Sequence, residues 1–149
     1  MALMVSISGI RGIFGSDLTP ENLSRFTAAY GSWLQGGTVV VGRDSRISGK
    51  ICEDIVVATL RSVGCNVIRV GIVPTPTVAM GVFKYKAQGG IIISASHNPG
   101  EWNALKLLNS KSEFLDVEQG KAVMALADKG AFSYVDAFHL GEEIEDTTL

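Results

Sequence analysis

The sequence predicts an α/β protein, namely a three-layer α/β/α sandwich with a mixed, mostly parallel sheet. Apolar runs of strand length alternate three times with amphipathic segments of helix length, which is the pattern of successive βα units. Two further apolar runs, at residues 90–93 and 104–108, are followed by one more helical segment. Right-handed crossovers place the loops of successive units at one sheet edge, where α/β proteins bind ligands. We expect three loops to line a cleft there: residues 42–50, 73–75 and 94–99.

The first unit consists of a short strand at residues 5–8 and a helix that begins near Thr19. Thr19 can cap the helix, and Pro20 suits its first position. Gly36 and Gly37 should end it. The apolar face has helical spacing and indicates core packing: Leu23, Phe26, Tyr30, Trp33 and Leu34.

Arg11 lies between the first strand and the first helix, in the glycine-rich stretch Gly9-Ile10-Arg11-Gly12. By composition alone this stretch fits an ordinary turn with a solvated arginine, because short glycine patterns are weak signals. The other interpretation is a tight backbone path that holds Arg11 at a functional site.

The second unit consists of a buried strand at residues 38–41 and a helix at residues 48–63, joined by a polar loop. Two interpretations of this loop stay open. It caps the helix through Ser48 and binds no ligand, or it borders a site and contributes Arg43. A P-loop is excluded, because Ile51 follows the Gly-Lys pair where that motif needs Ser or Thr.

The third unit comprises a strand at residues 66–70 and a helix at residues 75–83, with Thr75 as its cap. Only Gly100-Glu101-Trp102 separates the last loop from the strand at residues 104–108, which is too short for a parallel crossover. We therefore expect the strand at residues 104–108 to run antiparallel to the strand at residues 90–93.

The last helix begins at a capping box formed by Asp116 and Gln119 and reaches about residue 128. Beyond Gly130 the periodicity weakens and the chain becomes acidic. We therefore expect one domain at residues 1–130 and an acidic linker at residues 131–149.

Composition excludes several classes of protein. The net charge is −2, so no basic surface for nucleic acid is expected. No apolar run approaches the roughly 20 residues of a membrane-spanning helix. The first residues lack the basic and apolar regions of a secretory signal, so we expect a cytoplasmic protein. Cys52 and Cys65 form no CxxC motif and fit buried, reduced thiols.

Ser96 is the strongest candidate for a reactive residue. It lies in Ser94-Ala95-Ser96-His97-Asn98-Pro99, after a buried strand, and its small neighbours leave the hydroxyl accessible. A hydrolase with His97 as base is disfavoured, because adjacent residues of an extended loop point to opposite sides. Phosphoryl transfer needs mainly positioning and nearby cations, and Lys106, Arg11, Arg43 and His97 are the available ones.

At these residues the sequence resembles the α-D-phosphohexomutases, the family of phosphoglucomutase and phosphomannomutase. Their signature is a Ser-His-Asn-Pro loop whose serine carries the transferred phosphate, followed by Asn-Gly-x-Lys. The second segment here is Asn103-Ala104-Leu105-Lys106, with Ala104 in place of the usual glycine. The family also has segments similar to Gly-Ile-Arg-Gly near the N-terminus and to Gly-Arg-Asp-Ser-Arg after the second strand.

The resemblance implies a reversible mutase that interconverts hexose 1-phosphate and hexose 6-phosphate through a hexose 1,6-bisphosphate. It makes Ser96 the phosphorylated residue, with Lys106, Arg11 and His97 also catalytic. The same resemblance implies that substrate or phosphate is bound by Arg43, Asn98 and Asn103.

The resemblance also implies a Mg²⁺ ion, held by the phosphate on Ser96 and by an Asp-rich loop of another domain. These 149 residues contain no such loop and match only the first of the family's four domains. We therefore expect the chain to need the remaining domains of the same polypeptide and to be inactive alone. The alternative is a stand-alone sugar-phosphate-binding module without turnover.

Overall fold

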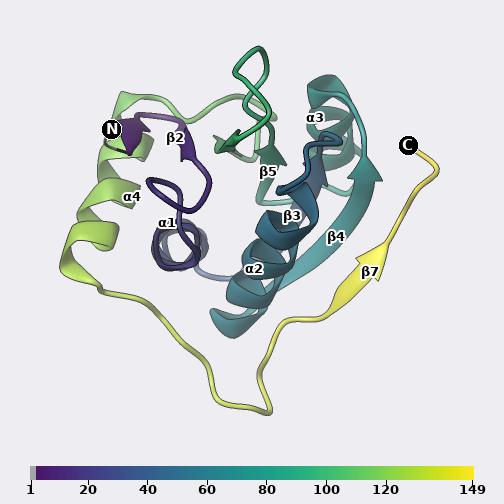
Figure 1. Ribbon diagram of the computed structural model, residues 1–149. Coiled ribbons are helices and arrows are strands. Elements are labelled where there is room, and N and C mark those ends of the chain that lie inside the picture. Colours follow the sequence, from purple (N-terminus) through teal and green to yellow (C-terminus); the bar gives the residue numbers. More distant parts are fainter. Residues whose placement is uncertain (1–2) are drawn as a thin grey trace.

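A mixed sheet carries the fold in the computed structural model, which describes residues 3–149 (Figure 1). Within these residues the strand order is β1-β2-β6-β5-β3-β4-β7. The strands are β1 (Met4–Ser6), β2 (Gly9–Ile13), β3 (Gly37–Arg43), β4 (Cys65–Ile72), β5 (Gly89–Ile93), β6 (Trp102–Leu108) and β7 (Glu143–Glu145). The helices are α1 (Pro20–Leu34), α2 (Gly49–Ser62), α3 (Thr75–Lys84) and α4 (Val117–Lys129).

The strand directions confirm the predicted mixed sheet. β3 pairs in parallel with both β4 and β5, and β7 adds to β4 in the same direction. β6 returns antiparallel to β5, with Ile93 opposite Leu105, as the short connection predicts. β2 and β1 then extend the sheet with two more antiparallel pairings.

The helices form two layers on opposite faces of the sheet (Figure 1). Side chains of α1, α2 and α4 pack against one face, together with Val39 and Val41 of β3. Val40, between them, points to the other face and packs against α3. The period of two along β3 therefore separates two cores, and the three-layer prediction is confirmed.

Two helix caps agree with the sequence analysis and two do not. Thr19 caps α1, and Asp116 forms the capping box of α4 with Gln119. Ser48 stands at the start of α2, but its hydroxyl makes no cap bond and accepts instead from Asn103. Thr75 is not the cap of α3, because extended Pro74 precedes the helix and Thr75 is its first residue.

The glycine-rich stretch around Arg11 is a strand and not a turn. It forms β2, in which Gly9 lies opposite Lys106 and Arg11 lies opposite Ala104. A Cβ atom at position 9 would collide with the carbonyl group of Leu105, so a glycine lets β2 approach β6 closely. This pairing brings Arg11 to the strand that carries Lys106.

Residues 131–149 pack onto the domain, although the sequence shows no element there. β7 pairs with β4, Asp146 accepts hydrogen bonds from Tyr85 and Lys84, and Leu149 reaches the core beneath α3. That this segment links to a second domain stays a prediction.

Both cysteines are free and buried, and burial raises the pKa of each thiol to about 11. Among residues 3–149 no helix combines the length and the apolar character needed to cross a membrane.

Tyr30 joins α1 to the sheet and should contribute measurably to stability. Its buried hydroxyl donates to the Leu108 carbonyl oxygen at 2.5 Å and accepts from the Gly90 amide at 3.0 Å. Burial also raises the pKa of Tyr30. Tyr30→Phe leaves two buried backbone groups without this partner, so we expect the free energy of unfolding to fall by about 1–3 kcal/mol in urea titrations. Tyr134→Phe, at an exposed tyrosine, is the matched control, and an equal loss in both variants would contradict this role.

Candidate active site

Ser96 lies at the tip of the loop that follows β5. Its backbone is left-handed, with a φ of 53°, and its amide donates to Ser94 Oγ at 3.1 Å. The Asn98 amide closes the next turn by donating to the Ala95 carbonyl oxygen at 3.1 Å. Ala95 is buried while Ser96 is exposed, so this turn presents the Ser96 hydroxyl to solvent.

Lys106 reaches the Ser96 hydroxyl from the neighbouring antiparallel strand. Its Nζ lies 2.5 Å from Ser96 Oγ. Leu105 and Leu107 enter the core on the opposite face of β6, as alternation along the strand predicts. The β5–β6 pairing thus places a lysine ammonium group directly beside the serine.

Arg11 contributes a second cation from β2. Its guanidinium donates to Asn98 Oδ1 at 3.5 Å and to Met4 Sδ at 3.3 Å. Arg11 and Lys106 line a pocket of about 250 Å³ with four residues of the loop: Ala95, Ser96, His97 and Asn98. The structure therefore brings together the signature loop and two cations that lie far from each other in the sequence.

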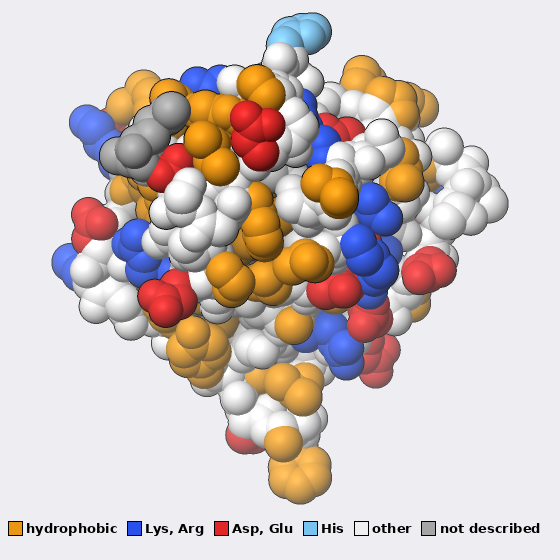
Figure 2. Space-filling view, viewed as in Figure 1, with side chains coloured by type: hydrophobic (Ala, Val, Ile, Leu, Met, Phe, Trp, Pro, Cys, Tyr) orange, Lys and Arg blue, Asp and Glu red, His pale blue; other side chains and the backbone are white. Residues whose placement is uncertain are grey.

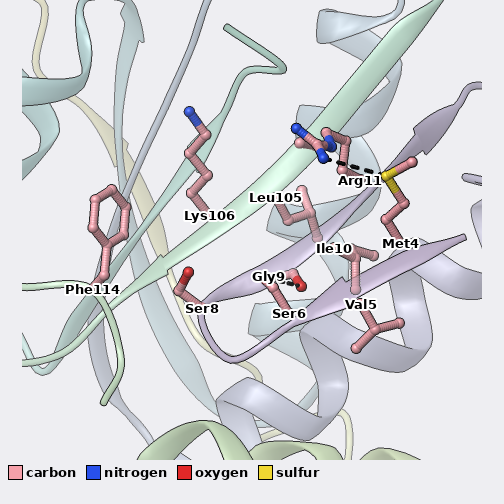
Figure 3. Close-up of a pocket in the computed structure, with 11 residues that line it drawn as sticks. Met4, Val5, Ser6, Ser8, Gly9, Ile10, Arg11, Leu105, Lys106 and Phe114 are labelled. Carbon is pink, nitrogen blue, oxygen red and sulfur yellow. Dashed lines mark hydrogen bonds between the residues drawn. The ribbon is translucent and has the colours of Figure 1, made fainter. Parts of the chain in front are cut away.

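A larger groove of about 520 Å³ adjoins this pocket on the β1–β2–β6 part of the sheet. Arg11 and Lys106 line both spaces, and Met4 and Phe114 add apolar surface to the groove. Figure 3 shows the Lys106 side chain extending away from β6, and the hydrogen bond from Arg11 to Met4. The two cations therefore stand where the pocket and the groove meet.

His97 is exposed on the pocket rim. Among the hydrogen bonds of residues 3–149, none joins its imidazole to Ser96, whose hydroxyl pairs with Lys106 instead. This geometry offers no Ser–His pair of the hydrolase kind.

The structure does not place Arg43 or Asn103 in the Ser96 pocket. Arg43 Nε lies 3.4 Å from Glu53 Oε1, and Arg43 lines a separate pocket near β7. Asn103 is fully buried, and its amide donates to Ser48 Oγ at 2.9 Å. Asn103 therefore joins β6 to the start of α2. Alternation along β6 indicates that the Asn103 side chain points into the core and not into the pocket. Asn103 shares its face of the strand with core Leu105 and not with Lys106.

Arg46, and not Arg43, is the arginine of the loop after β3 that reaches the Ser96 loop. Its guanidinium donates to backbone carbonyl oxygens of the loop, including that of Ser96 at 2.8 Å. Cations also occur elsewhere on the surface, and Figure 2 shows Lys and Arg side chains dispersed among acidic and apolar ones on the face in view.

The fold and the pocket define an α/β domain in which the loop after β5 presents a serine hydroxyl to a lysine ammonium group of β6. Residues 3–134 match the family model described as phosphoglucomutase/phosphomannomutase, alpha/beta/alpha domain I. The chain belongs to this family and corresponds to its first domain.

Curated relatives and a solved structure agree with this assignment. The chain is 41% identical over 140 residues to the phosphoglucosamine mutase of Clostridioides difficile, covering 91% of this chain and 31% of the relative. It is 39% identical over 131 residues to a phosphoglucomutase/phosphomannomutase of Thermococcus kodakarensis, covering 85% of this chain and 29% of the relative. A crystal structure of a candidate phosphomannomutase from Thermus thermophilus superimposes with a TM-score of 0.81 at 30% identity, covering 96% of this chain and 33% of that one. The chain thus spans about a third of the length of these relatives.

Proposed function

We propose that this chain is the phosphoserine domain of a phosphohexomutase, which interconverts hexose 1-phosphate and hexose 6-phosphate through a hexose 1,6-bisphosphate. The observation that carries the proposal is the 2.5 Å contact between Lys106 Nζ and Ser96 Oγ. The remaining domains belong to the same polypeptide in this proposal, because the relatives are about three times as long. Residues 131–149 lead towards them.

Phosphorylated Ser96 carries about −1.5 to −2 charges, which nearby cations must offset. One cation about 4 Å from a unit charge contributes about 4 kcal/mol at an effective dielectric constant of ~20. Lys106 supplies one such cation at the hydroxyl oxygen itself, and Arg11 adds a second positive charge to the lining of the pocket. The pocket therefore favours a phosphoserine over a neutral serine.

In the transfer step the bond between phosphorus and Ser96 Oγ breaks, and a new bond forms between phosphorus and a sugar hydroxyl oxygen. The sugar hydroxyl loses its proton to solvent, and Lys106 lies where it passes a proton to the departing Oγ and then regains one from solvent. Arg11 stabilises the negative charge on the transferring phosphoryl group. The bisphosphate then turns over and returns its other phosphate to Ser96, which completes the isomerisation.

The adjoining groove offers room for a sugar phosphate beside the two cations. Its volume of about 520 Å³ lies within the range of small-molecule sites. Lys106 and Arg11 at its mouth can contact the phosphate of a hexose phosphate that approaches Ser96. In this proposal Asn98 and His97, on the pocket rim, add hydrogen bonds to substrate or phosphate.

The described residues of this chain do not provide a complete set of Mg²⁺ ligands. Mg²⁺ takes oxygen ligands, mainly carboxylates and phosphates, and residues 3–149 contain no cluster of acidic or metal-ligating side chains that could hold it. At the pocket the chain would offer the oxygens of the phosphate on Ser96. In this proposal the other ligands come from outside the chain, and the ion supplies charge stabilisation when bound.

The chain by itself should fold but show no turnover. Its two hydrophobic cores favour cooperative folding. A bisphosphate that reorients needs protein walls on more than one side, whereas this pocket is open to solvent. We expect circular dichroism to show a cooperative melt. Coupled assays with Mg²⁺ on glucose 1-phosphate, mannose 1-phosphate and glucosamine 1-phosphate should show no conversion by residues 1–149.

The control is the complete polypeptide, which should convert at least one of these sugars. Turnover by residues 1–149 that survives repurification and disappears in Ser96→Ala would contradict dependence on further domains. A complete polypeptide that binds sugar phosphates without converting any would favour the binding module instead.

A further inference from the structure

Arg46 makes more hydrogen bonds to residues 96–102 than Lys106 or Arg11 does, although it comes from the loop between β3 and α2. Its Nη2 lies 2.8 Å from the carbonyl oxygens of both Ser96 and Asn98. Its Nη1 lies 2.6 Å from the carbonyl oxygen of Pro99 and 3.2 Å from that of Trp102. One guanidinium group therefore binds the loop at both ends of its turn.

Asp44 fixes the orientation of this guanidinium. Its Oδ2 accepts from Arg46 Nε at 3.1 Å, and its Oδ1 accepts from the Arg46 amide at 3.1 Å. The Asp44 amide in turn donates to the carbonyl oxygen of Ile93, the last residue of β5, at 3.1 Å. The Arg46 side chain is only 11% exposed. The arginine is thus held by the same strand that leads into the Ser96 loop.

The hydrogen bonds of Arg46 leave no donor for a ligand. A guanidinium group has five N–H donors. One N–H bonds Asp44, and the remaining four face the carbonyl oxygens of Ser96, Asn98, Pro99 and Trp102. Arg46 therefore differs from Lys106 and Arg11, whose charged groups line the open pocket.

We propose that Arg46 is a positioning residue, which holds the Ser96 loop in the shape needed for phosphoryl transfer and binds no phosphate itself. The expected effect on mutase kinetics rests on the proposed function, whereas the effect of Arg46 on the shape of the loop does not. Ser96 has a φ of 53°, a conformation that residues other than glycine adopt only when their surroundings hold it. The carbonyl oxygens that converge on Arg46 belong to this turn, so the guanidinium supplies that support.

Lysine cannot replace arginine in this role. Its ammonium group is a point charge with three donors, whereas four carbonyl oxygens and one carboxylate surround the planar fork of Arg46. Arg46→Lys therefore keeps the charge and removes the geometry. Arg25→Lys, at a half-buried arginine of α1, is the matched control, because this arginine lies over the Phe26 ring and donates to Asn22 of the same helix.

The first test uses the chain itself and does not depend on mutase activity. Solvent-exchange NMR measures the Ser96 and Asn98 amides, and the amide-to-α-proton coupling of Ser96 reports its φ. In Arg46→Lys we expect both amides to exchange at least about tenfold faster and the coupling to change, with the rest of the spectrum preserved. Arg25→Lys should match the unmodified chain. Unchanged exchange and coupling in a folded Arg46→Lys chain would overturn the proposal.

The second test uses the complete polypeptide. Arg46→Lys should lower kcat about 10²-fold and change KM less than about threefold, because a displaced nucleophile loses reactivity more than substrate affinity. In Arg46→Ala, added guanidinium at millimolar concentration should restore activity at least about fivefold, and ammonium should not. The same rescue keeps the test valid if Arg46→Lys folds poorly.

The outcomes separate the two proposals. A wild-type polypeptide without mutase activity rejects the proposed function, while the NMR result still decides the role of Arg46. An active wild type with normal kcat in Arg46→Lys rejects the positioning role and leaves the proposed function intact. Direct contact of Arg46 with phosphate, seen as a ³¹P shift of phosphoserine that changes in Arg46→Lys while the loop amides do not, would also reject it.

Discussion

Ser96→Ala should abolish mutase activity in the complete polypeptide, lowering kcat by roughly 10⁴-fold or more, as loss of a covalent nucleophile typically does. The Ser96 hydroxyl is exposed at the tip of its loop and bonds to Lys106, and among residues 3–149 no other serine hydroxyl makes a hydrogen bond to Lys106. Mass spectrometry of tryptic peptides from the wild-type protein should find the phosphate on Ser96. The variant should carry none in that peptide and should melt like the wild type, because no core contact is lost.

Ser94→Ala is the matched control for this experiment. Ser94 lies in the same peptide, but its hydroxyl accepts the Ser96 amide and does not contact Lys106. We expect Ser94→Ala to keep the phosphate on Ser96 and to lose less than about tenfold in rate. Phosphate mapped reproducibly to Ser94, together with a fully active Ser96→Ala, would reject Ser96 as the phosphorylated residue.

The order of elements could be predicted because its signals are local. Apolar runs of strand length and capped helices mark β3 to α4, and the short connection after Gly100 requires the antiparallel return of β6. Two strands, β2 and β7, could not be predicted from the sequence, each for a different reason. Gly9 and Gly12 make β2 resemble a turn, and β7 is a short acidic edge strand that depends on pairing with β4. Pairing partners distant in the sequence leave no local signal.

The centre of the candidate site could also be predicted. Ser96 follows a buried strand, and alternation along β6 sends Lys106 away from the core, so both positions follow from strand geometry. Arg11 needed the resemblance to a known family, because its own surroundings in sequence indicate a turn. The structure then places it in the pocket through the pairing of β2 with β6.

The choice between Arg43 and Arg46 could not be made from sequence. Both belong to one polar loop, only three residues apart, and either could reach a neighbouring ligand. In the structure Arg43 pairs with the buried carboxylate of Glu53, whereas Asp44 turns Arg46 towards the Ser96 loop. Glu53 lies on the following helix α2, whereas the loop carbonyl oxygens lie 50 or more residues further along the chain. Tertiary packing therefore decides which groups each arginine of this loop contacts.

Lys106→Ala in the complete polypeptide should lower kcat by about 10²–10³-fold, the usual effect of removing one preorganised donor from a transition state. Lys106 Nζ lies 2.5 Å from Ser96 Oγ, where negative charge develops as the phosphoryl group leaves. KM should change little, because Arg11 still lines the pocket. The half-buried Lys106 side chain fills no core position, so the melting temperature should stay close to that of the wild type.

One further variant, Lys106→Arg, separates the charge of Lys106 from its proton-transfer role. Lys106→Arg keeps a cation near Ser96 but exchanges protons poorly at neutral pH, since a guanidinium remains protonated. If proton transfer dominates, Lys106→Arg should be as slow as Lys106→Ala; if charge dominates, it should recover at least about tenfold. Lys111→Ala, at an exposed lysine outside both spaces that Lys106 lines, is the matched control and should keep normal kinetics. A folded Lys106→Ala with a normal kcat would show that Lys106 is an ordinary solvated strand residue.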